Sequence, residues 1–151
     1  MRYLLFSTLF CLLIPTGVAA EKARDLTQLD ACKILTPADV AAVTKRKVVT
    51  SVGGQVHCSY VVEAPQSGAD TYDFYLQEAA VTQALLELKS PADKGAPVAG
   101  LWNEAYVGPA VGSPKQLSLV ALRKGDMAIQ IQGPNKDVLI ALGKLAVSRL
   151  K

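Results

Sequence analysis

Three segments of this chain alternate apolar and polar side chains with a period of two, and they constrain the fold more than any other feature. The sharpest alternation covers residues 56–63, and residues 71–77 and 127–132 repeat it. Successive side chains of a β-strand point to opposite faces, so each segment predicts a strand with one buried and one solvated face. Strands of this kind are typical of an antiparallel sheet.

Helical segments separate these strands. The segment TPAD at 36–39 predicts a short helix, because Thr caps a helix N-terminus well and Pro suits the first turn. Residues 78–89 predict a second helix, and residues 135–150 a third, in which Gly143 indicates close packing. The second helix carries apolar residues along one side: Val81, Leu85 and Leu88.

Segments 48–52, 104–107 and 116–123 predict three further strands, with Gly53-Gly54 and residues 124–126 as hairpin turns. The Pro- and Gly-rich residues 90–100 are expected to form turns. The fold class that follows is α+β. It is a single, mainly antiparallel sheet of about six strands covered by two longer helices and one short helix.

The N-terminus resembles an export signal. Arg2 precedes an apolar run over residues 3–14, too short to span a bilayer as a helix, and Ala20 ends a small-residue cleavage site. We expect a signal peptide at 1–20 that is cleaved, a loose lead-in at 21–31, and a single domain at 32–151. A retained membrane anchor is the alternative. The expected location is the periplasm or the extracellular medium.

Two cysteines remain once the signal is removed, Cys32 and Cys58. In an oxidising compartment an isolated pair is most simply a disulfide, so we predict a Cys32–Cys58 bridge. Cys11 lies inside the apolar run and is preceded by Phe10, whereas a lipoprotein signal has a small residue there. We therefore expect an exported protein without a lipid anchor.

His57, the only histidine, directly precedes Cys58. On a strand these side chains point to opposite faces, so they do not make a Cys–His nucleophilic pair. His57 shares its face with Ser59 and Glu63, but strand neighbours two apart lie about 7 Å from each other, too far for a hydrogen bond. No G-x-S-x-G motif is present. We expect no catalytic residues and predict that the chain is not an enzyme.

Metal, cofactor and nucleic-acid binding all lack support. One histidine and two bridged cysteines are fewer ligands than zinc uses, and no phosphate-binding glycine pattern is present. A net charge of +3 gives no electrostatic reason to bind nucleic acid. No later apolar run has the length of a membrane span, so we expect no stable membrane insertion after signal cleavage.

Trp102, the only tryptophan, follows the Pro- and Gly-rich stretch. An exposed indole on a loop is a contact anchor for a ligand or partner, whereas an indole that covers one end of the core is the commoner case. The sequence leaves both open. We take Trp102 and its neighbour Asn103 as the first binding candidates. Tyr75, on the polar face of its strand, is the next.

Four segments in the same order resemble those of a family of small exported bacterial domains, many of them lipoproteins of unknown function. They are DACKILTPADV at 30–40, CSY at 58–60, GLWNEAY at 100–106 and LRKGD at 122–126. The resemblance covers about residue 30 to the end. It implies bridged cysteines, a helix-covered antiparallel sheet and no shared catalytic residues. Trp102 stands where the family pattern has glycine, which puts the geometry of that turn in question.

These features favour a secreted or periplasmic, non-enzymatic binding module. Its ligand is a small molecule, a peptide or an envelope protein. The alternatives are an inhibitor of a secreted enzyme, a structural envelope protein and, as the weakest, a hydrolase that uses Ser59 and His57.

Overall fold

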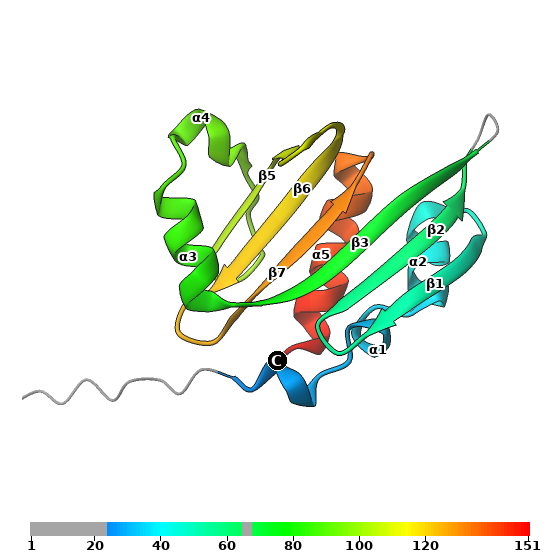
Figure 1. The fold of residues 1–151 in the computed structure, drawn as a ribbon, viewed down its shortest axis with the longest axis horizontal. Helices are drawn as coiled ribbons and strands as arrows, with labels where there is room; N and C mark the ends of the chain where they lie inside the picture. Colours follow the sequence, from blue (N-terminus) through cyan, green and yellow to red (C-terminus); the bar gives the residue numbers. More distant parts are fainter. Residues whose placement is uncertain (1–23, 65–67) are drawn as a thin grey trace, which may run out of the picture.

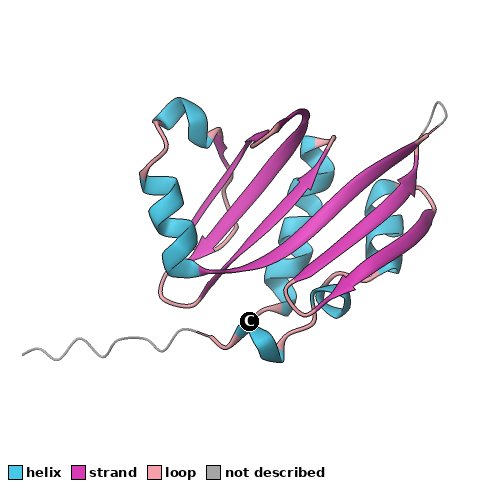
Figure 2. Ribbon diagram, viewed as in Figure 1, coloured by secondary structure: helices cyan, strands magenta, loops and turns pink. Residues whose placement is uncertain are grey.

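The computed structural model describes residues 24–64 and 68–151, so the expected signal peptide and its cleavage site lie outside the described residues. Figures 1 and 2 show one sheet with helices packed against it. The strands are β1 (Val48–Gly54), β2 (His57–Glu63), β3 (Ala69–Glu78), β4 (Ala96–Pro97), β5 (Glu104–Ala110), β6 (Ser113–Arg123) and β7 (Met127–Gly133). The helices are the 3₁₀ turn η1 (Leu26–Gln28) and α1 (Ala31–Ile34), α2 (Pro37–Thr44), α3 (Ala79–Glu87), α4 (Pro91–Lys94) and α5 (Lys136–Arg149).

The strands form one open sheet in the order β1-β2-β3-β7-β6-β5-β4, and every neighbouring pair is antiparallel. The prediction of an α+β fold with an antiparallel sheet is therefore confirmed. The sheet has seven strands instead of about six, because the two-residue β4 pairs with β5 inside the stretch expected to form only turns. The C-terminal strand β7 lies in the middle, between β3 and β6.

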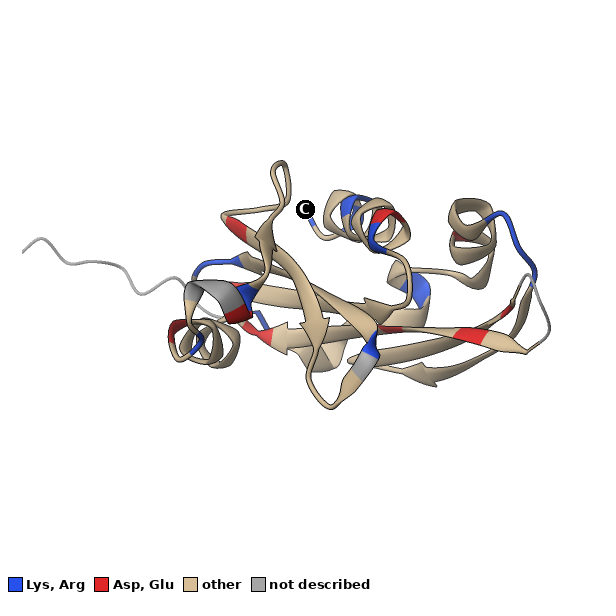
Figure 3. Ribbon diagram, turned by 90° about the horizontal axis from the view of Figure 1, so that it is seen from above, with Lys and Arg blue, Asp and Glu red and all other residues tan. Residues whose placement is uncertain are grey.

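The two faces of the sheet are covered differently. Figure 3 looks along the sheet and shows α2 and α5 on one side and α3 on the other. The main core lies under α5, where the inward residues of β3, β6 and β7 meet the helix. The expected inward residues of β3 and β7 are all buried there: Tyr72, Phe74, Leu76, Met127, Ile129 and Ile131.

Close packing at Gly143 is also present, as the sequence indicated. A Cβ atom at this position would lie 2.5 Å from Cδ2 of Leu119, which is fully buried on β6. Glycine therefore lets α5 approach the sheet closely.

Local signals fix the N-terminal part of the domain. Thr36 and Asp39 form a reciprocal capping box at the start of α2. Asp39 also accepts hydrogen bonds from Arg149, with Nη1–Oδ2 at 2.5 Å and Nη2–Oδ1 at 2.7 Å, so α2 is tied to α5. Arg149 holds the pKa of the Asp39 carboxyl well below its usual range. The predicted Cys32–Cys58 disulfide is present and links α1 to β2.

The first hairpin and the α3–β4 connection differ from expectation. Gly53 and Gly54 belong to β1, where they pair with Cys58 and His57, and the turn falls on Gln55 and Val56. Val56 is thereby placed outside the core and is 40% exposed. A Cβ on Gly53 would overlap the backbone of the partner strand, so the glycine serves close pairing. Residues 90–94 form a capped helix, α4, because the Ser90 hydroxyl accepts from the backbone N–H of Asp93.

No helix within the described residues combines the length and apolar character that a membrane crossing needs.

Candidate functional site

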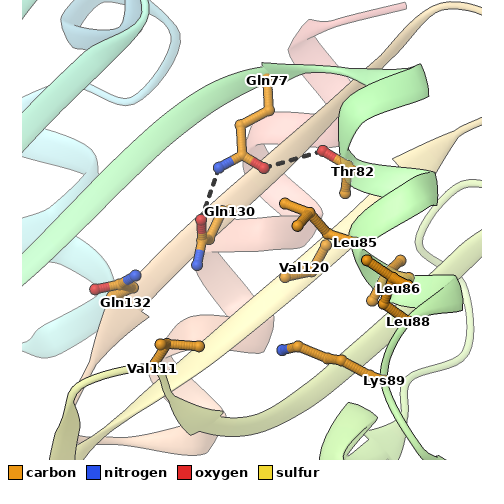
Figure 4. Close-up of a pocket in the computed structure, with 10 residues that line it drawn as sticks. All are labelled: Gln77, Thr82, Leu85, Leu86, Leu88, Lys89, Val111, Val120, Gln130 and Gln132. Carbon is orange, nitrogen blue, oxygen red and sulfur yellow. Dashed lines mark hydrogen bonds between the residues drawn. The ribbon is translucent and has the colours of Figure 1, made fainter.

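The face of the sheet opposite α5 carries a groove beside α3. It has a volume of about 510 Å³, within the range of about 300–1,000 Å³ usual for ligand pockets. Figure 4 shows α3 forming one wall, the strands forming the floor, and the β5–β6 hairpin closing one end. The lining residues are Gln77, Thr82, Leu85, Leu86, Leu88, Lys89, Val111, Val120, Gln130 and Gln132. We call this feature the α3 groove.

The polar groups on the floor of the α3 groove largely satisfy one another. Thr82 donates its hydroxyl to Gln77 Oε1 at 3.0 Å, and Gln77 donates its amide to Gln130 Oε1 at 2.7 Å. Gln130 then donates to the hydroxyl of Ser118 at 2.8 Å. Figure 4 shows the first two of these contacts bridging α3, β3 and β7. Because the Gln77 and Gln130 side chains are already bonded within this chain, an apolar ligand over these two residues leaves fewer polar groups without a partner.

The apolar walls of the α3 groove are unusually exposed. Leu85 is 55% exposed, Leu88 is 84% exposed, and Val111 at the hairpin tip is also 84% exposed. The apolar side of this helix was correctly located in the sequence, but it faces solvent and the groove and not the core. The sheet contact is made instead by Ala79, Thr82 and Leu86. A cluster of exposed aliphatic side chains around a hollow marks a binding surface more often than isolated exposed residues do.

The charge in the α3 groove is a single cation. Lys89 follows α3, and Figure 4 shows its side chain reaching across the groove toward Val111. No lining residue is acidic, and Lys89 makes no ion pair among the residues that the structure describes. Elsewhere in the ribbon of Figure 3, basic and acidic residues are interspersed.

Two of the residues singled out in the sequence lie on a different part of the domain. Trp102 is half-buried against the core and lines a shallow hollow together with Arg123, Lys144 and Lys151. Its φ is +46°, in the left-handed region where the family pattern has glycine. Asn103 accepts a hydrogen bond from the backbone N–H of Lys124 at 2.9 Å, so its side chain braces the β6–β7 turn.

Tyr75 lies on the same face as the α3 groove and next to its floor. It is paired in register with Gln130 on β7, and with His57 on β2. The His57 and Tyr75 rings stack with their centroids 4.4 Å apart. Burial raises the pKa of the Tyr75 hydroxyl. The sequence thus placed Tyr75 on this face, but it did not place the groove beside it.

His57 and Ser59 do not meet as a catalytic pair. His57 Nε2 lies 3.4 Å from Asp73 Oδ1, and Asp73 is paired in register with Ser59. In a catalytic triad the histidine bonds to the serine, whereas here the His57 imidazole contacts Asp73 and stacks on Tyr75. Glu63 is six residues from His57 along β2, about 20 Å at the rise of a strand.

Within residues 24–64 and 68–151, no three His, Cys, Asp or Glu side chains gather closely enough to hold an ion.

The groove residues were missed because they come from separate parts of the chain: β3, α3 and the residues after it, the β5–β6 turn, β6 and β7. Two features of the sequence could have indicated the groove. One is the pair Leu85 and Leu88 on one side of the helix, and the other is the glutamines on the polar strand faces, Gln77, Gln130 and Gln132. No family model, curated protein or solved structure matches this chain.

Proposed function

We propose that this chain is a secreted or periplasmic, non-enzymatic binding module, and that the α3 groove is its ligand site. The observation that carries the proposal is the exposure of Leu85, Leu88 and Val111 around a hollow of about 510 Å³. Exposed aliphatic side chains beside a concave surface represent apolar area that a ligand removes from water. Membership of the family of small exported domains belongs to the same proposal.

Two further observations support it. The disulfide is compatible with an oxidising compartment outside the cytoplasm, where such bridges persist. The His57 ring lies beside Asp73 and stacks on Tyr75, and no hydrogen bond joins it to Ser59 within the part of the chain that the structure describes. A binding role uses the open face without requiring either residue to react.

The proposal is tested by native mass spectrometry on protein exported through its own N-terminal segment from a bacterial host. We expect a mass that shows cleavage after Ala20, one disulfide, and a retained or readily acquired ligand from the host envelope extract. The same spectra are recorded for Leu85→Glu and for Val81→Glu. Both positions lie on α3 with similar exposure, 55% and 53%, but only Leu85 lines the groove.

Binding through the α3 groove requires that Leu85→Glu loses the ligand and that Val81→Glu keeps it. If both variants keep the ligand, the site lies elsewhere on the domain. A wild-type protein that retains and acquires nothing from the extract contradicts the binding function itself.

A further inference from the structure

We infer that the ligand of the α3 groove is a medium-chain alkyl carboxylate, whose chain lies along α3 and whose carboxylate pairs with Lys89. This inference rests on the proposed function and gives the chemical class of its ligand. It follows from three properties of the groove: an elongated apolar wall, a floor on which the Gln77 and Gln130 amides bond to each other, and one cation at one end.

The apolar wall has the shape of a single chain. Leu85 and Leu86 on α3 and Leu88 at its C-terminal end follow one another, and Val120 lies opposite them on the floor. From Thr82 to Glu87 the helix advances about 7.5 Å, and Leu88 and Lys89 continue the wall just beyond its end. One acyl layer of a membrane occupies about 15 Å, half of the hydrocarbon core. The groove therefore fits a chain shorter than that of a typical membrane lipid.

The floor selects against a ligand rich in hydrogen-bonding groups. The chain of bonds from Thr82 through Gln77 and Gln130 to Ser118 uses the side-chain carbonyl oxygens of Gln77 and Gln130, two of the three glutamines that line the groove. A peptide backbone brings a donor and an acceptor with every residue, and these need partners once buried. An alkyl chain brings none, so it covers this floor at lower cost.

The cation gives the groove a polarity. Lys89 reaches over the groove at the end closed by Val111, and no acidic residue lines the groove. Its three ammonium donors suit a small anion without demanding a fixed geometry. A carboxylate at this end leaves the alkyl chain directed along α3 toward Thr82.

The test is a calorimetric titration of the exported, disulfide-bonded protein with decanoate, decanol and decyltrimethylammonium, the two ions below their micelle concentrations and decanol below its solubility limit. We expect decanoate to bind more tightly than decanol, and the cationic amphiphile to bind most weakly. Affinity for the series from hexanoate to decanoate should rise by up to about fourfold for each added methylene. It should level off for dodecanoate and hexadecanoate, whose ends extend beyond the groove.

Two matched variants locate the carboxylate. Lys89→Met removes the cation and keeps a side chain of similar length, so it should weaken decanoate binding by about fivefold and leave decanol unchanged. Lys136→Met removes the same charge from an exposed position at the start of α5 and should change neither. Backbone amide shifts in a heteronuclear NMR spectrum should concentrate in α3, β6 and β7.

Equal affinity for the three amphiphiles would overturn the inference, because it would indicate unselective adsorption to apolar surface. Failure of all three to shift the α3 amides would also overturn it. If a ligand retained in native mass spectrometry shifts those amides where decanoate does not, the ligand class is wrong and the binding function stands. If the retained ligand is a peptide, the same conclusion holds.

Discussion

The Cys32–Cys58 disulfide should account for a large share of the stability of this domain. It joins residues 26 apart in sequence, so in the unfolded chain it closes one medium-sized loop. The chain-entropy relation gives about 3.5 kcal/mol for a loop of this length. Folded single domains have a free energy of unfolding of about 5–15 kcal/mol, so the loss should be easy to measure.

The assay is urea denaturation of the wild type with and without reductant, alongside a Cys32→Ser, Cys58→Ala double variant. Alanine is chosen at position 58 because this side chain is fully buried, and a hydroxyl there would lack a partner. Reduction of the wild type should lower the free energy of unfolding by about 3.5 kcal/mol. It should also raise the m-value, because the unfolded chain without the bridge exposes more surface.

Comparing reduction of the wild type with the double variant separates the stability that comes from the cross-link from the stability that comes from packing of the sulfur atoms. Reduction keeps both sulfur atoms in place, whereas the double variant also removes the buried Cys58 sulfur and should lose somewhat more stability. Reductant should leave the double variant unchanged. A loss of less than about 1 kcal/mol on reduction of the wild type would refute the loop-closure reasoning, and it would mean that the remaining contacts already confine the N-terminal segment.

Three further substitutions test the packing and the ion pair. Asp39→Asn should cost about 1–2 kcal/mol at neutral pH, because it removes the carboxylate that pairs with Arg149 and weakens the reciprocal bond to Thr36. Because the pKa of Asp39 is lowered in the fold, this contribution is fully present above the unfolded pKa and lost as pH falls below about 4. Urea titrations from pH 7 to 2.5 should show the wild type converging on the variant; a constant gap would contradict the assignment. Gly133→Ala should cost about 1–3 kcal/mol, since its Cβ would overlap the buried ring of Tyr72; an unchanged melting temperature would show that the ring can move. Tyr60→Phe should cost about 1–2 kcal/mol in chemical denaturation, because the buried hydroxyl donates to a backbone carbonyl after α1; a neutral result would mean that water replaces this bond.

Much of the local structure could be predicted because it depends on near neighbours in the chain. The alternation of β3 and β7 identifies their buried faces, since side chains alternate along any strand. The capping box at Thr36 needs only residues three apart. The disulfide followed from the number of cysteines and the expected compartment, without any geometry.

The sequence was less informative where two segments compete for one role. Gly53-Gly54 has the composition of a hairpin turn, but pairing of Gly53 with Cys58 moves the turn to Gln55 and Val56. Local composition cannot decide this, because the register of β1 against β2 sets which residues are left to turn.

The candidate site was decided by tertiary structure. An apolar stripe on a helix predicts that this face of the helix is covered, but it does not predict which surface covers it. Here β7 returns to the centre of the sheet and α5 covers one face, so α3 packs at the margin of the other face through Ala79, Thr82 and Leu86. Leu85 and Leu88 are left beside the glutamines of β3 and β7. The apolar side of α3 and the polar faces of the strands could be predicted from the sequence. The groove could not, because it forms only where strands far apart in the chain are neighbours in the sheet.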